Sequence, residues 1–131
     1  MQPGAVRRCS RAARTTGRRA GRRVVAELVT RFFAEEGFTT SADEVRSRVL
    51  PFVAEPANAA FLAFDGDGAV GIATLTTAYG FETGRYGEIE ELYVVPSHRR
   101  RGVARALVEA ALAEAARLGC HDTGRRVLDR A

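Results

Sequence analysis

Lysine and long apolar runs are missing from this sequence of 131 residues, and cysteine is scarce. Without lysine, the chain cannot contain a nucleotide-binding loop that ends in Gly-Lys-Ser or Gly-Lys-Thr. No run approaches the ~20 apolar residues that a membrane-spanning helix needs, so we expect no membrane partner. The two cysteines, Cys9 and Cys120, lie too far apart in sequence for a disulfide-stabilised framework. This usage favours a reducing compartment, and we expect a cytoplasmic protein.

The surroundings of Cys120 do not predict a metal site. His121 follows it directly, and both residue types bind metals, but no further ligand stands at a metal-binding spacing. The sequence therefore indicates a buried or incidental cysteine, and we expect no metal.

Charge is unevenly distributed along a chain whose length fits one domain with one core. Residues 1–23 contain eight arginines and no acidic residue, whereas the remaining 108 residues contain twelve arginines and sixteen acidic residues. The net charge of +4 therefore comes from the N-terminal segment, and the rest of the chain is mildly acidic, at about −4.

The segment 1–20 is rich in arginine and poor in apolar residues, so it cannot bury enough surface to offset its ordering entropy. We expect a disordered tail. Three roles stay open for it: an arm that binds nucleic acid, an organellar transit peptide, or an extension without a role. No aromatic residue alternates with the arginines, so a stacking platform for bases is missing and nucleic-acid binding is disfavoured.

Hydrophobic periodicity predicts three helices and three strands. The first helix is expected over Gly21–Glu36, and Ser41 with Glu44 forms a capping box for a second helix that Pro51 would end or kink. The glycines of Asp65-Gly66-Asp67-Gly68 predict a hairpin turn. The remaining expected elements are strands over Ala59–Phe64, Val70–Ala78 and Glu88–Val95 and a helix over Val103–Leu118.

The most informative segment is Arg99–Ala104, which connects the last strand to the last helix. Such a turn presents unpaired backbone N–H groups at the positive end of a helix, where a phosphate binds well. Gly102 lets the backbone approach a ligand closely. Three adjacent arginines at a helix N-terminus repel one another and oppose the helix dipole. This unfavourable arrangement indicates a bound anion that compensates the positive charge.

Together with its flanking strand and helix, this turn resembles the acetyl-coenzyme A signature of the GNAT N-acetyltransferase family. The resemblance rests on Arg99-x-x-Gly102-x-Ala104 within the stretch Glu90–Leu107, and it extends over residues 21–119. It implies an α/β (α+β) fold with a mixed sheet flanked by helices, and acetyl-coenzyme A as cosubstrate. By this resemblance, the coenzyme-binding residues are Leu92, Tyr93, Val94, Arg99, Arg100, Arg101, Gly102, Val103, Ala104 and Arg105.

The resemblance also implies a role for each part of this set. Backbone N–H groups of Arg100–Arg105 would hold the pyrophosphate, and the backbone of Leu92–Val94 would bind the pantetheine arm. The amide of Val94, or one beside it, would polarise the thioester.

In this family a carboxylate commonly removes a proton from the acceptor amine, and Glu90 and Glu91 are the candidates. Strand alternation is expected to place their side chains on opposite faces, with Glu90 favoured for the acceptor side. Glu82 and Glu88 extend the acidic character of this region. A small cationic amine, such as a polyamine, an aminoglycoside or a lysine side chain, would suit such an acceptor site.

The chain departs from the family pattern at both ends. The family opens with a strand where this chain has the tail 1–20, and it continues past Gly119 with further strands, a helix and a tyrosine that protonates the leaving thiolate. Residues 120–131 are expected not to match that pattern. We therefore expect a fold that is incomplete at both ends and either marginally stable or rescued by a homodimer or a partner.

Three functions follow from these observations. The first is N-acetyl transfer from acetyl-coenzyme A to a primary amine. The second is a truncated or degenerate member that binds coenzyme A without catalysis. The third, which the sequence disfavours, is nucleic-acid binding led by the arginine-rich tail.

Overall fold

The computed structural model describes residues 12–14 and 19–125 of the chain. It confirms the α/β (α+β) fold, with a mixed sheet flanked by helices. None of the helices in these residues is long and apolar enough to cross a membrane. In chain order the elements are β1 (Ala12–Arg14), α2 (Arg19–Glu36), α3 (Ala42–Ala54), β2 (Ala59–Asp65), β3 (Gly68–Gly80), β4 (Gly84–Val94), the 3-10 helix η1 (Pro96–His98), α4 (Val103–Arg117) and β5 (Asp122–Arg125).

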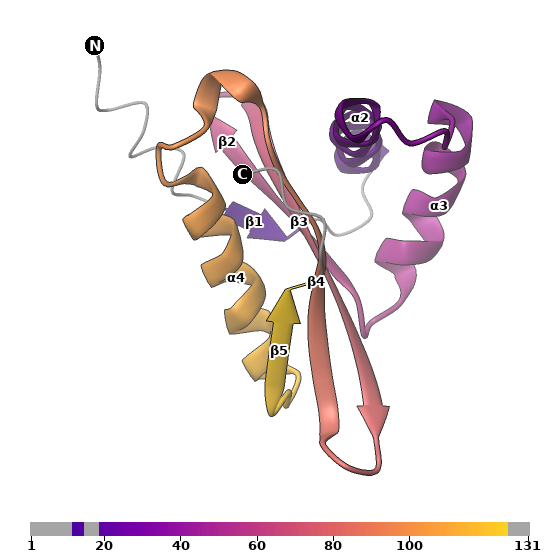
Figure 1. Cartoon of the computed structure of the whole chain (residues 1–131), viewed down its shortest axis with the longest axis vertical. Helices are drawn as coiled ribbons and strands as arrows, with labels where there is room; N and C mark the ends of the chain where they lie inside the picture. Colours follow the sequence, from indigo (N-terminus) through magenta and orange to yellow (C-terminus); the bar gives the residue numbers. More distant parts are fainter. Residues whose placement is uncertain (1–11, 15–18, 126–131) are drawn as a thin grey trace.

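The strands form one sheet in the order β1-β2-β3-β4-β5. Neighbouring strands from β1 to β4 are antiparallel, whereas β5 runs parallel to β4. Helix α4 covers one face of the sheet, and α2 and α3 lie on the other (Figure 1). We refer to these as the α4 face and the α2–α3 face.

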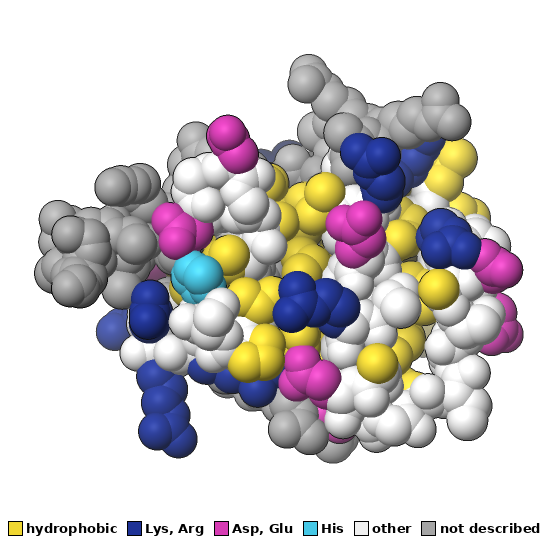
Figure 2. All heavy atoms as spheres, turned by 90° about the horizontal axis from the view of Figure 1, so that it is seen from above, with side chains coloured by type: hydrophobic (Ala, Val, Ile, Leu, Met, Phe, Trp, Pro, Cys, Tyr) yellow, Lys and Arg dark blue, Asp and Glu magenta, His cyan; other side chains and the backbone are white. Residues whose placement is uncertain are grey.

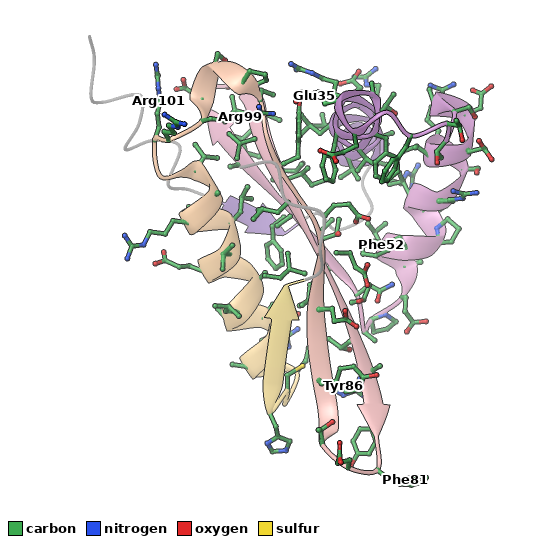
Figure 3. All side chains as sticks on the ribbon, in the orientation of Figure 1. Glu35, Phe52, Phe81, Tyr86, Arg99 and Arg101 are labelled. Carbon is green, nitrogen blue, oxygen red and sulfur yellow. The ribbon has the colours of Figure 1, made fainter. Side chains whose placement is uncertain are left out.

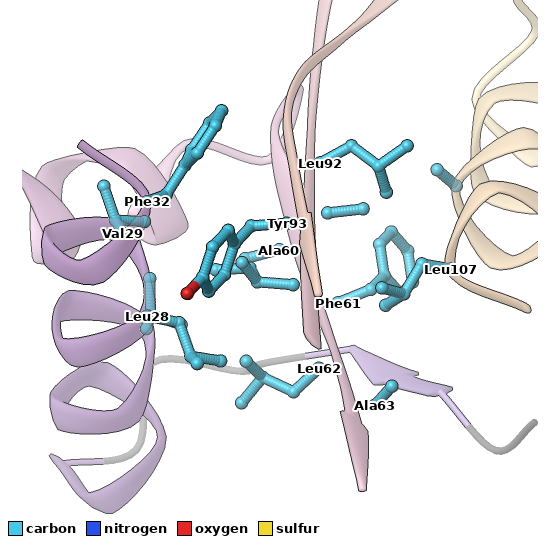
Figure 4. Close-up of a cluster of buried hydrophobic side chains, with 14 of the residues drawn as sticks. Leu28, Val29, Phe32, Ala60, Phe61, Leu62, Ala63, Leu92, Tyr93 and Leu107 are labelled. Carbon is cyan, nitrogen blue, oxygen red and sulfur yellow. The ribbon is translucent and has the colours of Figure 1, made fainter. Parts of the chain in front are cut away.

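Buried apolar side chains fill both sides of the sheet (Figure 4). On the α2–α3 face, the ring of Phe32 stacks on that of Tyr93, with centroids 5.5 Å apart. On the α4 face, Leu92 and Phe61 lie on the same side as Leu107 (Figure 4). Burying a side chain of this size contributes ~1.5–3 kcal/mol, so hydrophobic burial holds both helical layers to the sheet.

Local signals in the sequence explain several element boundaries. The predicted capping box is confirmed: the Glu44 N–H donates to Ser41 Oγ at 3.1 Å, and the Ser41 N–H donates to Glu44 Oε1 at 2.8 Å. Helix α3 nevertheless continues through Pro51 to its end at Ala54. Because Pro51 lies within the last turn, its missing N–H removes only one helical hydrogen bond.

Two short strands and a longer hairpin correct the sequence-based expectations. Strand β1 lies inside the segment 1–20 that we expected to be a disordered tail, and β5 lies beyond Gly119, where the hydrophobic periodicity predicted no strand. Strands β3 and β4 extend to Gly80 and Gly84, where a polar connection was expected. Strand pairing uses backbone groups, which side-chain patterns in short segments do not reveal. The expected disorder of residues 1–11 and 15–18 lies outside the described residues.

Candidate functional site

The turn between β4 and α4 presents backbone N–H groups at the N-terminus of α4. Arg100 has φ 62° and Gly102 has φ 83°, so two left-handed residues bend the chain into the helix. The Ala106 N–H donates to the Gly102 carbonyl oxygen at 3.1 Å. The N–H groups of Val103–Arg105 precede that first helical bond, and in the described part of the chain no side chain caps them. The turn is therefore an arrangement that attracts an anion.

The arginines of this turn differ in where their charge lies. Arg100 and Arg101 are exposed, and arginine side chains project from this end of the molecule in Figure 2. Figure 3 shows Arg101 at the start of α4, on the side away from α2. An anion at the turn would therefore meet the charges of Arg100 and Arg101.

Arg99 points toward α2 instead (Figure 3). Its Nη2 donates to Glu35 Oε1 at 2.8 Å, and its Nε donates to the carbonyl oxygen of Val94, also at 2.8 Å. Glu35 therefore offsets the charge of Arg99, and the expectation that all three arginines add their charge to an anion site stays a prediction. Sequence reasoning missed Glu35, because nothing in the local pattern links the end of α2 to a turn 64 residues further along the chain.

Tyr93 completes this contact. Its hydroxyl donates to Glu35 Oε2 at 2.5 Å, and the guanidinium carbon of Arg99 lies 5.6 Å from the centroid of its ring. Burial, followed by the hydrogen bond to Glu35, raises the pKa of the Tyr93 phenol. The phenol therefore stays protonated and acts as a donor, and we call these three residues the Glu35–Tyr93–Arg99 network.

One edge of β4 is covered by β5 only in part. Strand β5 pairs with Tyr86–Ile89, and among residues 12–14 and 19–125 no strand pairs with this edge from Glu90 to Val94. On the opposite edge, the Val95 N–H donates to the Val70 carbonyl oxygen at 2.9 Å. The alternation of an antiparallel ladder therefore directs the N–H and C=O of Val94 and of Leu92 toward the open edge. The edge leads directly into the turn, so a linear ligand with a terminal phosphate could contact both.

A β-bulge in β4 brings Glu90 and Glu91 to one face of the sheet. The register pairs Ala73 with Leu92 and Leu75 with Ile89, so the two glutamates lie opposite the single residue Thr74. The expectation that they occupy opposite faces is therefore wrong, because the extra residue interrupts the alternation of side chains.

Threonine hydroxyl groups of β3 hold both carboxylates on the α2–α3 face. The Thr76 hydroxyl donates to Glu90 Oε2 at 3.1 Å. The Glu91 N–H donates to Thr74 Oγ1 at 3.0 Å, and the Thr74 hydroxyl in turn donates to Glu91 Oε1. Sequence analysis did not single out these threonines, although their alternate positions on β3 are a signal that they share a face.

Both carboxylates line a groove of about 310 Å³ between the sheet and helices α2 and α3. Their oxygens and the two threonine hydroxyls form the sheet side of this groove. The helix side is apolar apart from Arg48 of α3, and Phe52 extends from α3 toward the sheet (Figure 3). Its apolar members are Val25, Val29 and Phe33 from α2 and Val45, Val49 and Phe52 from α3.

Two of the four acidic residues that we expected near the acceptor do not line this groove. Glu82 lies in the turn that joins β3 to β4, next to Phe81 at the far tip of the hairpin (Figure 3). Glu88 precedes Ile89 on β4 and pairs with Thr76 of β3, in the regular part of the ladder between the two strands. Within residues 12–14 and 19–125, only Glu90 and Glu91 supply carboxylates to the groove.

Comparison with known proteins agrees with the fold described above. Residues 24–123 match the acetyltransferase (GNAT) family, and no curated protein sequence matches the chain. An integron cassette protein, HFX_CASS3, from the mobile metagenome of Cole Harbour Salt Marsh has a similar structure, with a TM-score of 0.83 and 20% sequence identity over 91% of this chain and 79% of that chain.

Two aminoglycoside acetyltransferases are also similar in structure. AAC(6')-Iy in complex with CoA has a TM-score of 0.79 and 17% identity over 89% of this chain and 76% of that chain. AAC(6')-IG from Acinetobacter haemolyticus has a TM-score of 0.75 and 21% identity over 89% of this chain and 79% of that chain. At such identities the likeness concerns the fold.

Proposed function

Because the chain belongs to the acetyltransferase (GNAT) family, we propose that it transfers the acetyl group of acetyl-coenzyme A to the primary amine of a small, cationic acceptor. The observation that carries this proposal is the position of β4 between two binding features. Its open edge and the turn after it are suited to the coenzyme, and its two glutamates line the groove on the α2–α3 face. A thioester and an amine could therefore meet at the same strand.

The coenzyme is proposed to lie along the open edge of β4 and to end at the turn. N–H groups of Arg100–Arg105 are the proposed ligands of the pyrophosphate, with the exposed guanidinium groups of Arg100 and Arg101 adding charge. Backbone groups of Leu92–Val94 are the proposed partners of the pantetheine arm. The carbonyl of Val94 already accepts a hydrogen bond from Arg99, so we assign only its N–H to the coenzyme, as one candidate to polarise the thioester.

The acceptor is proposed to enter the groove as an ammonium ion. Glu90 or Glu91 takes one proton from it, directly or through a water molecule, because only the free amine is a nucleophile. The nitrogen lone pair then attacks the acetyl carbonyl carbon. A C–N bond forms and the C–S bond breaks. The nitrogen then loses a second proton, which passes to the departing thiolate, and this leaves a neutral N-acetylated amine and free coenzyme A. Both glutamates line the groove, which supports either side chain as the proposed base.

Gly102→Asp tests the coenzyme half of this proposal. A Cβ at Gly102 meets no atom within 4 Å, so the variant adds a carboxylate at the turn without a clash. We expect its affinity for acetyl-coenzyme A, measured by isothermal titration calorimetry, to fall at least about tenfold, because two anions then compete for one site.

Gly119→Asp is the matched control for this experiment. Gly119 lies at the other end of α4, its φ of 85° is nearly that of Gly102, and a Cβ there also meets no atom within 4 Å. The control should bind the coenzyme as the wild type does. If Gly102→Asp also binds normally, the turn does not hold the pyrophosphate. If the wild type binds the coenzyme but acetylates no amine, the chain is a coenzyme-binding protein without catalysis.

A further inference from the structure

The groove on the α2–α3 face has two sides of opposite character, and this inference about its ligand rests on the proposed function. The sheet side carries both carboxylates, each held by a threonine hydroxyl. Among the residues that the structure describes, the helix side consists of valine and phenylalanine side chains, apart from Arg48 of α3. A ligand that satisfies both sides needs a cationic end and an apolar body.

The position of the charges in the groove limits where a cationic group can bind. Glu90 and Glu91 carry the negative charges, and Arg48 adds a positive charge among the described residues that line the groove. Arg48 lies at the rim, where its Nη2 is 3.7 Å from Glu44 Oε2 and two thirds of its side chain is exposed. The described lining therefore complements an ammonium group on the sheet side, next to Glu90 and Glu91, and offers it no carboxylate on the helix side.

We propose that the acceptor is a primary monoamine with an apolar body, of the arylalkylamine or alkylamine class. Its ammonium group lies against the carboxylates of Glu90 and Glu91, where the proton is removed. Its aromatic or aliphatic body packs against Phe33, Val49 and Phe52 on the helix side.

A polycation fits this groove poorly for a physical reason. An aminoglycoside or spermine carries several ammonium groups separated by a few bonds. When one of them contacts the glutamates, the others meet valine and phenylalanine side chains or approach Arg48, and a charge without a partner in such surroundings is costly. The volume of about 310 Å³ is also at the lower end for ligand sites, which span ~300–1,000 Å³.

The test compares kcat/KM for four amines at saturating acetyl-coenzyme A: 2-phenylethylamine, hexylamine, ethylamine and the aminoglycoside neamine. We expect the first two to exceed ethylamine at least about tenfold, because the added apolar atoms are buried in the groove. We also expect both to exceed neamine. If neamine proves the best substrate, the inference is overturned while the proposed acetyl transfer stands.

Two variants on α3 locate the apolar contact. Phe52→Ala should reduce the preference for 2-phenylethylamine over ethylamine about tenfold. Leu50→Ala is the matched control, because Leu50 is on the same helix but 50% exposed and outside the groove. The preference is a ratio measured on one sample, so a partly unfolded variant does not distort it. An unchanged preference in Phe52→Ala would overturn the assignment.

Calorimetric binding of 2-phenylethylamine in the presence of coenzyme A separates this inference from the proposed function. Binding that is weakened by Phe52→Ala, in a protein that acetylates no amine, would support the ligand class and contradict the catalytic proposal. Absence of binding would overturn the ligand class, whether or not another amine is acetylated.

Discussion

Glu35, Tyr93 and Arg99 connect three segments that are distant in sequence: the end of α2, the end of β4 and the turn before α4. Glu35 accepts hydrogen bonds from both partners, and Arg99 also binds the carbonyl of Val94. The side chains of Arg99 and Glu35 are 25% and 31% exposed, so water screens this ion pair less than one on the open surface. Arg99 therefore positions the turn, whereas Arg100 and Arg101 supply its external charge.

Arg99→Met should lower the free energy of unfolding by about 1–3 kcal/mol, because it removes hydrogen bonds of a charged donor to partly buried acceptors. Arg101→Met should change it by no more than about 0.5 kcal/mol, since that side chain is exposed. Urea unfolding followed by circular dichroism measures both values. Equal unfolding midpoints for the two variants would refute the difference in role.

At the scale of the elements, the capping box of α3 gives a stability effect that depends on pH. Ser41→Ala removes the side-chain cap and should lower the free energy of unfolding by ~1 kcal/mol. In the wild type, hydrogen bonds from the backbone and side chain of Ser41 lower the pKa of Glu44. Because the pKa of Glu44 is lower in the folded state, its carboxylate stabilises the fold at pH values above the pKa of an ordinary glutamate. This contribution is lost as the pH falls through the lower pKa of the folded state.

The difference in free energy of unfolding between the wild type and Ser41→Ala should therefore be smaller at about pH 3 than at about pH 7. Urea titrations at both values measure it. Alanine keeps the backbone N–H that donates to Glu44, so a difference that is the same at the two values would show that the Ser41 side chain does not lower the pKa of Glu44.

Elements with strong side-chain signals could be predicted from the sequence, and those set by backbone pairing could not. The capping box of α3, the turn at Asp65–Gly68 and the long apolar face of α4 all appear in the residue pattern and are confirmed. The β-bulge depends on the register between β3 and β4, which alternation within β4 does not report. Strands β1 and β5 have three and four residues, too few for a periodic signal.

The same distinction applies to the candidate site. The turn could be predicted because its glycine and arginines lie next to one another in sequence. The direction of the Arg99 side chain could not, because Glu35 is brought to it by the packing of α2 on the sheet. The groove also depends on packing, since its apolar side comes from two helices and its carboxylates from a distant strand.

At the scale of the whole molecule, the two proposed substrates bind to different parts of the sheet, and β4 contacts both of them. The turn leads into α4 on one face, while the groove lies on the α2–α3 face. The open edge of β4 connects these features, because its backbone faces the proposed coenzyme and its glutamates face the proposed amine. The homodimer, the marginal stability and the cytoplasmic location that the sequence led us to expect stay predictions.

The most direct test of the central claim is to identify both products of one reaction. The protein is incubated with acetyl-coenzyme A and the best amine of the panel, and mass spectrometry measures the N-acetylated amine while a thiol assay measures free coenzyme A. We predict equal amounts of the two products from the wild type.

The control is the double variant Glu90→Gln and Glu91→Gln, whose amide oxygens can still accept the hydrogen bonds from the threonines. It should bind acetyl-coenzyme A normally and form both products at least about a hundredfold more slowly, because it lacks a base. Release of coenzyme A without an N-acetylated amine, or equal rates in the wild type and the double variant, would contradict acetyl transfer at β4.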